Sequence, residues 1–348
     1  MTRVASLVAL CLSCFALAGC VGIDDETGSA DSLKPILTNT VNPQQAVSKT
    51  PLGLWSGGMT MLLMTTRDSA GPQSPWFGTK RAPEPTAARI VLYPPEKSLL
   101  ASMNPIASNA WTIAGVESLG ADRPASQLAT QAEGRDVLIY VHGFNETFES
   151  ATTSYAKLVA GIQFSGVPVL FTWPSRGALL DYVTDRESAM WSRDTLEDTL
   201  MALATDPRVG RIHIIAHSMG GLVTLEALRS IADRSGGLLG SRFGAIILAN
   251  PDVDMDLFKR QTKRLAPLVP KMTVIISAKD RALELSSKLA GNVPRVGTAD
   301  RAGLEQTGVK VVDATDYGSG IINHDIFMSR AELSGVIARA IENSGDPQ

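Results

Sequence analysis

The sequence predicts an α/β fold in which a mainly parallel sheet carries helices on both faces, and three observations support this prediction. Short runs of Val, Ile and Leu recur along the chain, and from residue 136 onward few polar residues interrupt them. Such runs are typical of strands that are covered on both faces. Amphipathic stretches with helical spacing alternate with these runs, which favours parallel strands joined by helices. Third, a length of 348 residues with 44% hydrophobic residues is enough for a large buried core.

The expected strands form an early group and a later group. No helical pattern separates the runs before residue 120, so we expect these strands to form an antiparallel edge. Helical patterns separate the later runs, which we expect to build the parallel part of one domain over 51–348. In chain order the expected strands are 59–65, 89–93, 111–116, 136–141, 167–172, 211–216, 245–249, 272–277 and 309–313.

Two helices have the clearest sequence patterns. Phe148 to Ile162 place apolar residues three and four positions apart, which predicts a helix with one apolar face. Asn145 precedes this helix and is predicted as its N-cap. Ser329 and Glu332 have the spacing of a capping box and predict the start of the last helix.

Charge and motif content exclude several classes of function. Lys and Arg number 32 against 35 Asp and Glu, a net charge of −3, and this balance excludes a strongly basic surface, so we expect no nucleic-acid partner. No Walker loop is present, and Gly318 and Gly320 lack the third glycine and the preceding strand of a dinucleotide site, so we expect no nucleotide. His213 and His217 lie on one expected strand, about 13 Å apart, too far to share a metal ion. We therefore expect no metal and no cofactor.

The first residues are typical of a bacterial lipoprotein signal peptide. The apolar run from Val4 to Ala18 is shorter than the ~20 residues that span a bilayer as a helix. Leu17 to Cys20 resembles the lipobox, in which the peptide is cut before a cysteine that then carries lipid. We therefore expect a signal peptide at 1–19, a lipidated Cys20 with a flexible tether to residue 50, and anchoring in the bacterial cell envelope. Val21 after the cysteine implies the outer membrane, facing the periplasm. An ordinary signal peptide and an ordered extension are the alternatives.

Ser218 is the candidate nucleophile. It lies between an expected strand and a helical pattern that begins at residue 219, which is the setting of a nucleophile elbow. A serine in such a turn needs small residues two positions before and after it, and the chain has Ala216 and Gly220 there. Ala216 departs from the usual glycine but is the least bulky alternative. An ordinary turn is the competing interpretation.

A serine hydroxyl needs a base, and the chain has four histidines. His213 is expected within the sheet, His217 faces away from the adjacent nucleophile, and His142 ends a strand. By elimination His324, which follows the last expected strand, is the candidate base. A structural histidine is the alternative there.

The third member of a triad should be a carboxylate that follows a strand, and two residues qualify. Asp280 comes after the expected strand 272–277, and it completes the chain order Ser, Asp, His that is known for such triads. The carboxylate would orient the imidazole and stabilise its protonated form. Asp252, after the strand 245–249, is the alternative, and a surface carboxylate that caps a helix is the structural interpretation of either.

The reaction also needs N–H donors for a developing oxyanion. The backbone N–H of Met219, at the start of the helix, is one candidate. The N–H of Phe144 is the other, because Gly143 lets the backbone approach closely. Trp173 ends an expected strand at the edge where ligands of α/β proteins bind, and it could line a substrate pocket or fill the core.

Together these segments resemble the alpha/beta hydrolase family of unknown function number nine hundred, over about four fifths of the chain. The matching segments are 65–68, 141–145, 171–175, 216–220 and 277–283. The resemblance implies a central sheet of about eight strands with an antiparallel N-terminal edge, and a serine hydrolase of the esterase type. It carries Ser218, Asp280 and His324 over as the triad, and it implies no particular substrate.

These observations predict a membrane-anchored serine hydrolase, a carboxylesterase or lipase-like enzyme that acts through an acyl-enzyme. Its partner would be an ester-bearing small molecule or a lipid-like substrate, with thioesters and amides as open alternatives. The competing hypothesis is a catalytically idle hydrolase fold that serves as an anchored interaction module in the envelope. Ala216 is the only sequence feature that favours the idle fold.

Overall fold

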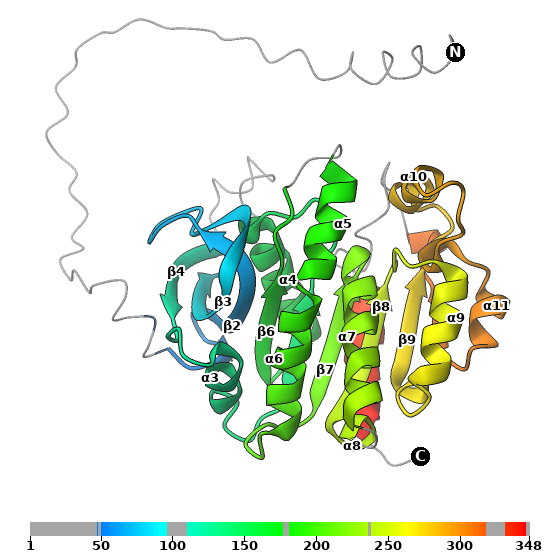
Figure 1. Cartoon of the computed structure of the whole chain (residues 1–348). Helices are drawn as coiled ribbons and strands as arrows, with labels where there is room; N and C mark the ends of the chain where they lie inside the picture. The colour runs from blue at the N-terminus through cyan, green and yellow to red at the C-terminus, as the bar shows by residue number, and fades with distance from the viewer. Residues whose placement is uncertain are drawn as a thin grey trace, which may run out of the picture. The chain divides into compact units, whose positions relative to one another are not determined.

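A ten-stranded sheet forms the centre of the fold (Figure 1). The computed structural model describes residues 47, 50–95, 110–176, 181–235, 238–317 and 331–345, and these belong to one compact unit. The predicted signal peptide, Cys20 and His324 lie outside the described residues. The strands are β1 (Gly53–Trp55), β2 (Gly58–Ser69), β3 (Phe77–Tyr93), β4 (Thr112–Ser118), β5 (Val137–Val141), β6 (Val167–Thr172), β7 (Ile212–His217), β8 (Phe243–Ala249), β9 (Met272–Ile276) and β10 (Lys310–Asp313).

The sheet has a large parallel part and a smaller antiparallel edge. Its strand order is β10-β9-β8-β7-β5-β6-β2-β3-β4, with β1 paired to β2. All neighbours from β10 to β2 are parallel, whereas β1, β3 and β4 are antiparallel to the strands they pair with. The expected antiparallel edge is therefore confirmed for β3 and β4. Strand β2 has two roles, because it is antiparallel to β3 but parallel to β6, and it lies inside the sheet.

Every expected strand is present, with two differences. The short strand β1 was not predicted, and with the nine strands expected from the sequence it makes a sheet of ten, slightly more than the about eight that the family resemblance implies. Strand β3 spans 17 residues where only 89–93 were expected. Its first part contains Pro83 and Pro85 and several charged residues, which mask the usual strand pattern. Register shifts between Thr65 and Ser69 let β2 follow this irregular partner.

Helices cover both faces of the sheet, as the alternating pattern predicts (Figure 1). Helices α3, α6, α7 and α9 pack on one face, and α4 and α13 pack on the other. The helices are α3 (Pro124–Thr130), α4 (Phe148–Ile162), α5 (Tyr182–Trp191), α6 (Arg193–Thr205), α7 (Met219–Ser235), α8 (Leu238–Arg242), α9 (Met255–Arg264), α10 (Arg281–Leu289), α11 (Arg301–Glu305) and α13 (Ala331–Glu342), with short 3-10 turns η3 (Val269–Lys271), η4 (Val296–Thr298), η5 (Thr315–Tyr317) and η6 (Asn343–Gly345).

The central strand β5 shows how the sheet separates two cores. Its residues point alternately to the two faces. Val137, Ile139 and Val141 join the core beneath α6 and α7, while Leu138 and Tyr140 join the core beneath α4 and α13. All five are fully buried, which explains why this strand is continuously apolar in sequence.

Helix α4 has the predicted bounds but a different cap. Thr147 is the N-cap, because its hydroxyl accepts the N–H of Ser150 at 3.1 Å while the Ser150 hydroxyl accepts the N–H of Thr147 at 2.9 Å. The predicted cap, Asn145, lies two residues earlier with φ = 64°, in the left-handed region. That prediction is wrong because a Thr–Ser pair closer to the helix already satisfies its first N–H groups.

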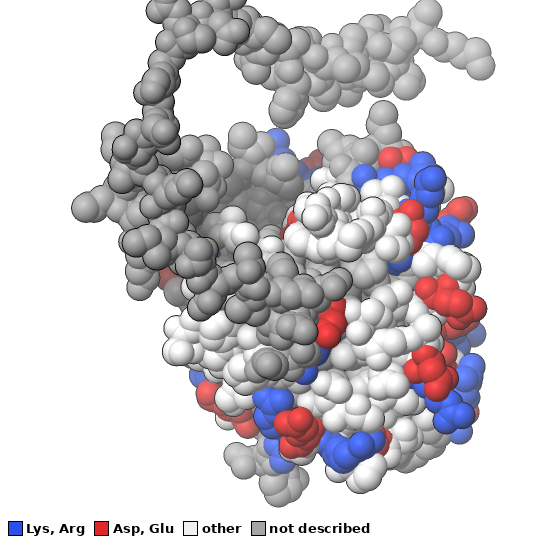
Figure 2. Space-filling view, turned by 90° about the vertical axis from the view of Figure 1, so that its left-hand side faces the viewer, with Lys and Arg blue, Asp and Glu red and all other residues white. Residues whose placement is uncertain are grey.

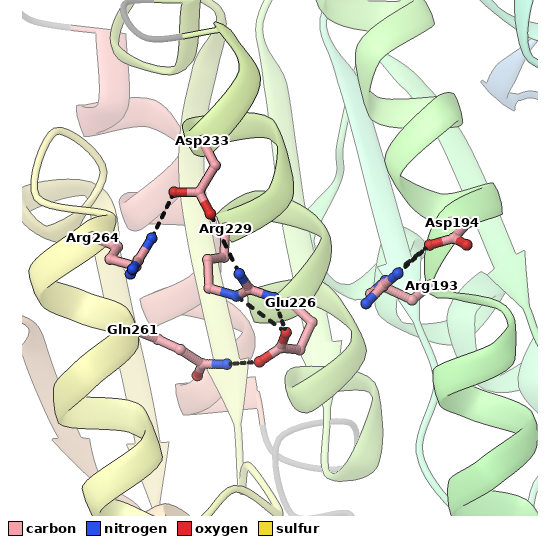
Figure 3. A network of polar contacts seen from close by, with 7 residues as sticks. All are labelled: Arg193, Asp194, Glu226, Arg229, Asp233, Gln261 and Arg264. Atoms are coloured by element: carbon pink, nitrogen blue, oxygen red, sulfur yellow. Dashed lines mark hydrogen bonds and ion pairs between the residues drawn. The ribbon is translucent and has the colours of Figure 1, made fainter.

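Helix α7, which follows the candidate nucleophile, is tied to α9 by polar side chains (Figure 3). Arg229 pairs with Glu226 at 2.8 Å and with Asp233 at 3.3 Å on its own helix. From α9, Arg264 reaches Asp233 at 2.9 Å, and Gln261 donates to Glu226 at 2.5 Å. Exposed ion pairs each contribute less than about 1 kcal/mol, so this network adds little to the position of α7, which its apolar residues in the core already hold.

On the side of the molecule drawn in Figure 2, acidic and basic residues lie next to each other around a central area of uncharged residues. Neighbouring charges of opposite sign cancel at short range and leave little electrostatic field at a distance.

Among the helices of the described residues, none has the length and apolar character needed to span a bilayer.

The packing of β6 in the core yields a stability prediction. Leu170 on β6 has no exposed surface, whereas Leu289 at the end of α10 is 60% exposed. Leu170→Ala is expected to lower the free energy of unfolding by about 2–5 kcal/mol, because it leaves a cavity between strand and helix. Leu289→Ala, the same substitution at the surface, is expected to change it by less than about 0.5 kcal/mol. Urea denaturation measures both, and equal losses would contradict the assigned position of β6.

Candidate active site

Four loops meet at the carboxyl edge of the parallel strands. They follow β5, β7, β8 and β9, which are consecutive neighbours in the sheet. Parallel neighbours bring their carboxyl ends to the same edge, and ligands of α/β proteins bind there. The loops carry His142 to Phe144, Ser218, Asn250 to Asp252 and Asp280. The fold therefore gathers most of the predicted site residues at one edge.

Ser218 occupies a left-handed turn between β7 and α7. Its φ is 51°, a strained conformation for a residue with a side chain. The N–H of Ser218 donates to the carbonyl of Ala249 at 2.9 Å, and its carbonyl accepts the N–H groups of Gly221 and Asp252, each at 3.0 Å. These three hydrogen bonds hold the turn in the shape of a nucleophile elbow.

The two small residues around Ser218 have different reasons for being small. A Cβ atom placed on Gly220 would lie 2.5 Å from the carbonyl oxygens of both Val141 and His142, so no side chain fits there. Ala216 lies fully buried in β7 between its neighbours in the sheet, and its methyl group packs in the core. The departure from glycine at Ala216 is therefore compatible with the turn.

Gly143 brings the loop after β5 against Ser218, the candidate nucleophile. A Cβ atom on Gly143 would lie 3.0 Å from Cβ of Ser218 and 2.9 Å from Nδ1 of His217. The N–H of Phe144 belongs to the next peptide, and the N–H of Met219 begins α7. Neither N–H donates in the loop and cap hydrogen bonds of the described residues. Met219 directly follows Ser218, and Phe144 directly follows Gly143, so both candidate oxyanion donors belong to segments that lie at Ser218.

Trp173 is a core residue that holds His142. Its side chain is fully buried, its ring stacks on that of His142 with centroids 4.8 Å apart, and its Nε1 donates to the His142 carbonyl at 3.1 Å. This burial favours the core interpretation of Trp173 over the substrate-pocket interpretation.

His142 is neutral, and its protonation can be assigned from its partners. The backbone N–H of Trp173 donates to Nε2 at 3.1 Å, so Nε2 carries no proton. The proton lies on Nδ1, which donates to the carbonyl of Gly143 at 2.8 Å. Burial first, and then the positive charge of Arg67, hold the pKa of His142 well below its usual value. His142 therefore has no role as a base.

Asp280 lies at the predicted place after β9, with its carboxylate held from two sides. One oxygen accepts the N–H of Leu283 at 3.0 Å and caps α10, and the other accepts Nδ2 of Asn250 at 2.6 Å. Asn250 is fully buried and directly follows Ala249, which binds the backbone of Ser218. Asn250 thus links the turn at Ser218 to the loop of Asp280. The sequence did not predict this role, because nothing local distinguishes Asn250 from an ordinary loop asparagine.

Asp252, the alternative acid, belongs to a different buried cluster. It lies 3.1 Å from Nε of Arg295 as an ion pair, and both residues are at most 4% exposed. Its carboxylate also accepts the hydroxyls of Tyr182 and Ser286, each at 2.7 Å. The ring of Tyr182 packs edge to face on Phe144, with centroids 5.5 Å apart. The cluster therefore braces the loop that carries a candidate oxyanion donor.

The other histidines are placed by the sheet. His213 is buried, and its Nδ1 accepts the N–H of Ala245 at 3.0 Å, as expected for a residue packed in the sheet. His217 is also buried, at the end of β7. His324 lies outside the described residues, so its role stays a prediction. Within the part of the chain that the structure describes, no group of three His, Cys, Asp or Glu side chains could hold a metal ion.

The tight approach at Gly220 can be tested by adding one methyl group. Gly220→Ala is expected to lower the free energy of unfolding by about 1–3 kcal/mol, since two carbonyl oxygens must move. Gly240→Ala in α8 is the matched control, because a Cβ atom there meets nothing within 4 Å. The control should leave stability unchanged or raise it slightly. Thermal unfolding that is the same for both variants would rule out the close contact.

A family model described as alpha/beta hydrolase of unknown function (DUF900) matches residues 123–341, more than half of the chain. A protein of Nostoc sp., the uncharacterized protein alr1448, is 25% identical over 126 residues, which cover 29% of this chain and 33% of that protein. The chain thus spans about a third of the length of this relative.

Several solved structures are similar at low identity. The esterase of Pyrobaculum calidifontis is 16% identical, with 74% of this chain and 81% of that chain covered and a TM-score of 0.37. A predicted CIB-like hydrolase of Thermoplasma acidophilum is 15% identical, with 74% and 93% covered and a TM-score of 0.37. Est1E of Butyrivibrio proteoclasticus is 12% identical, with 83% and 99% covered and a TM-score of 0.38. Similarities of this size say nothing about substrate. The family match, which runs from α3 to α13 and includes the turn at Ser218, shows that this chain belongs to the DUF900 family of alpha/beta hydrolases.

Proposed function

We propose that this protein is a serine hydrolase that cleaves carboxylic esters through an acyl-enzyme. The observation that carries the proposal is the left-handed conformation of Ser218, held between β7 and α7 with the loop of Gly143 directly against it. A strained serine with backbone N–H groups nearby is the arrangement that acyl transfer requires. Family membership supports a hydrolase.

In the proposed reaction Ser218 Oγ attacks the ester carbonyl while His324 accepts the hydroxyl proton. The N–H groups of Met219 and Phe144 stabilise the oxyanion of the tetrahedral intermediate. His324 then gives the proton to the departing alcohol, and water cleaves the acyl-enzyme by the same steps. Asp280 orients the imidazole and stabilises its charged form without taking the proton.

The contacts of the two candidate acids favour Asp280. An acid of a triad must leave an oxygen that can accept the imidazole N–H. The Asp252 carboxylate pairs with Arg295 and accepts two hydroxyls. Its negative charge is therefore largely neutralised and would stabilise a protonated histidine poorly. The Asp280 carboxylate accepts an amide and a backbone N–H, two neutral donors that hold it in place after β9. Hydrogen bonds of this kind orient a carboxylate without neutralising its charge.

Labelling with a fluorophosphonate tests the nucleophile. Incubation of the full chain in detergent should give one adduct, located on Ser218 by peptide mass, and none in Ser218→Ala. His324→Ala and Asp280→Asn should slow labelling by about a hundredfold or more, because each removes activation of the serine. Asp252→Asn should slow it far less than Asp280→Asn. A larger effect at Asp252 would assign the acid to that residue instead.

The same experiment decides between an enzyme and an idle fold. A folded sample that shows no adduct on Ser218 would reject the hydrolase proposal and favour an anchored interaction module. Hydrolysis of p-nitrophenyl esters of two to twelve carbons would then separate a short-chain esterase from a lipase-like enzyme, and would extend the proposal to a substrate class.

We also propose that Cys20 carries lipid and anchors the protein in the bacterial envelope, facing the periplasm. The support is the sequence of the first twenty residues alone. Metabolic labelling with a palmitate analogue should mark the wild-type protein and Cys14→Ala, and should not mark Cys20→Ala. Label that persists in Cys20→Ala would reject this anchor.

A further inference from the structure

A fully buried arginine, Arg67, lies next to the oxyanion loop. It projects from β2, which precedes the residues that the family model matches, and its residue is only 1% exposed. Its guanidinium forms four hydrogen bonds. Nη2 donates to the Glu146 carbonyl at 2.7 Å, Nη1 to the carbonyls of Gly78 and Ser175 at 3.1 and 3.2 Å, and Nε to the Thr172 hydroxyl at 2.8 Å. A buried charge is costly, so a site that retains one needs a reason.

The hydrogen bond from Arg67 to Thr172 is the first in a series of hydrogen bonds that leads to the carbonyl of Gly143. Thr172 Oγ1 accepts Nε–H of Arg67, so its own proton is directed to Nε2 of His142, 2.9 Å away, which it shares with the more distant N–H of Trp173 at 3.1 Å. His142 has its proton on Nδ1 and donates it to the carbonyl of Gly143 at 2.8 Å. Each group accepts from the one before and donates to the one after, and such chains strengthen each of their bonds.

The last link fixes the orientation of a candidate oxyanion donor. The carbonyl of Gly143 and the N–H of Phe144 belong to one peptide, which is planar and trans. The two groups therefore point in opposite directions. When His142 holds the carbonyl of Gly143 on its side, the N–H of Phe144 must point away from His142.

The far end of the same loop is held as well. The N–H of Glu146 donates to the Ser175 hydroxyl at 3.2 Å, and the Glu146 carbonyl accepts from Arg67. Between the two anchored ends lie Phe144 and Asn145, and Asn145 has φ = 64°. A short loop anchored at both ends has little freedom to reorient.

We propose that Arg67 is a positioning residue for the oxyanion hole, acting on the N–H of Phe144 through Thr172 and His142. This inference rests on the proposed function. It assigns a role in the active site to a strand outside the matched region, and it accounts for a buried charge that the triad does not use. Its guanidinium is suited to this place because the planar fork reaches three segments at once, which an ammonium group cannot do.

Removal of Arg67 would take a donor from three carbonyls and leave a cavity, so Thr172 offers a better test. Thr172→Val keeps shape and leaves Arg67 in place but breaks the chain, and Thr172→Ser keeps the hydroxyl. With p-nitrophenyl butyrate, Thr172→Val is expected to lower kcat by about tenfold to a hundredfold at nearly constant KM, since the loss falls on the transition state. Thr172→Ser should stay close to wild type. The control is Thr152→Val, which removes an equally buried hydroxyl in α4 and should leave kcat unchanged.

A second readout separates positioning from general loosening. The affinity for a trifluoromethyl ketone, which forms an oxyanion on the serine, should fall in Thr172→Val by the same factor as kcat. Nitrogen-15 NMR of the wild type should show His142 protonated on Nδ1, and that proton should exchange faster in Thr172→Val. Unchanged kcat and ketone affinity in Thr172→Val, or unchanged proton exchange, would overturn the inference. A wild-type protein without activity or serine labelling would overturn the proposed function instead, while the NMR result would still report on the chain.

Discussion

The left-handed turn at Ser218 is the constraint on which the carboxyl edge depends. Holding a serine at φ = 51° costs about 1–3 kcal/mol, and the surrounding backbone must offset this cost. The offset comes from the carbonyl of Ala249 and the N–H groups of Gly221 and Asp252. Because these groups come from the end of β8 with its following loop and from the start of α7, the turn keeps its shape only when β7, β8 and α7 are assembled. Close approach at Gly143 and Gly220 follows from the same turn.

The described residues at this edge contain more buried charge than the body of the sheet. Arg67, Asp185, Asp252, Asp280 and Arg295 are all at most 4% exposed. Each has its charge matched by polar partners, for example the Ser175 hydroxyl at 2.5 Å from the Asp185 carboxylate. Replacing a whole buried ion pair such as Asp252 and Arg295 with apolar residues often leaves stability unchanged or improved, so stability alone does not explain such pairs. These groups lie at the edge and not in the two apolar cores. Their several polar partners hold the loops there in one orientation.

Features that act within one segment could be predicted from the sequence, and features that act across segments could not. The strand, turn and helix around Ser218 lie within one stretch, so their pattern is local. The choice between Asp280 and Asp252 depends on Arg295 and Tyr182, which are distant from Asp252 in the chain and carry no local signal. The prediction for the N-cap of α4 was wrong because asparagine is a residue type that favours N-caps, but Asn145 lies two residues before the actual cap, Thr147. The predicted strand 89–93 was too short because the prolines and charged residues of β3 obscure the alternation of apolar and polar residues that marks a strand.

The position of β2 explains how an N-terminal segment can take part in a site built by later strands. Because β2 pairs in parallel with β6, Arg67 near its end reaches the same edge as Thr172 at the end of β6. The antiparallel pairing with β3 brings Gly78 close enough to accept from the same guanidinium. The N-terminal strands therefore do more than widen the sheet. Without β2 the loop from Gly143 to Glu146 would lose the donor that holds its far end, and the chain to His142 would lose its first member. The parallel strands that carry Ser218 and the added strand that holds the loop of Phe144 are thus parts of one arrangement, which is the basis of the proposed oxyanion hole.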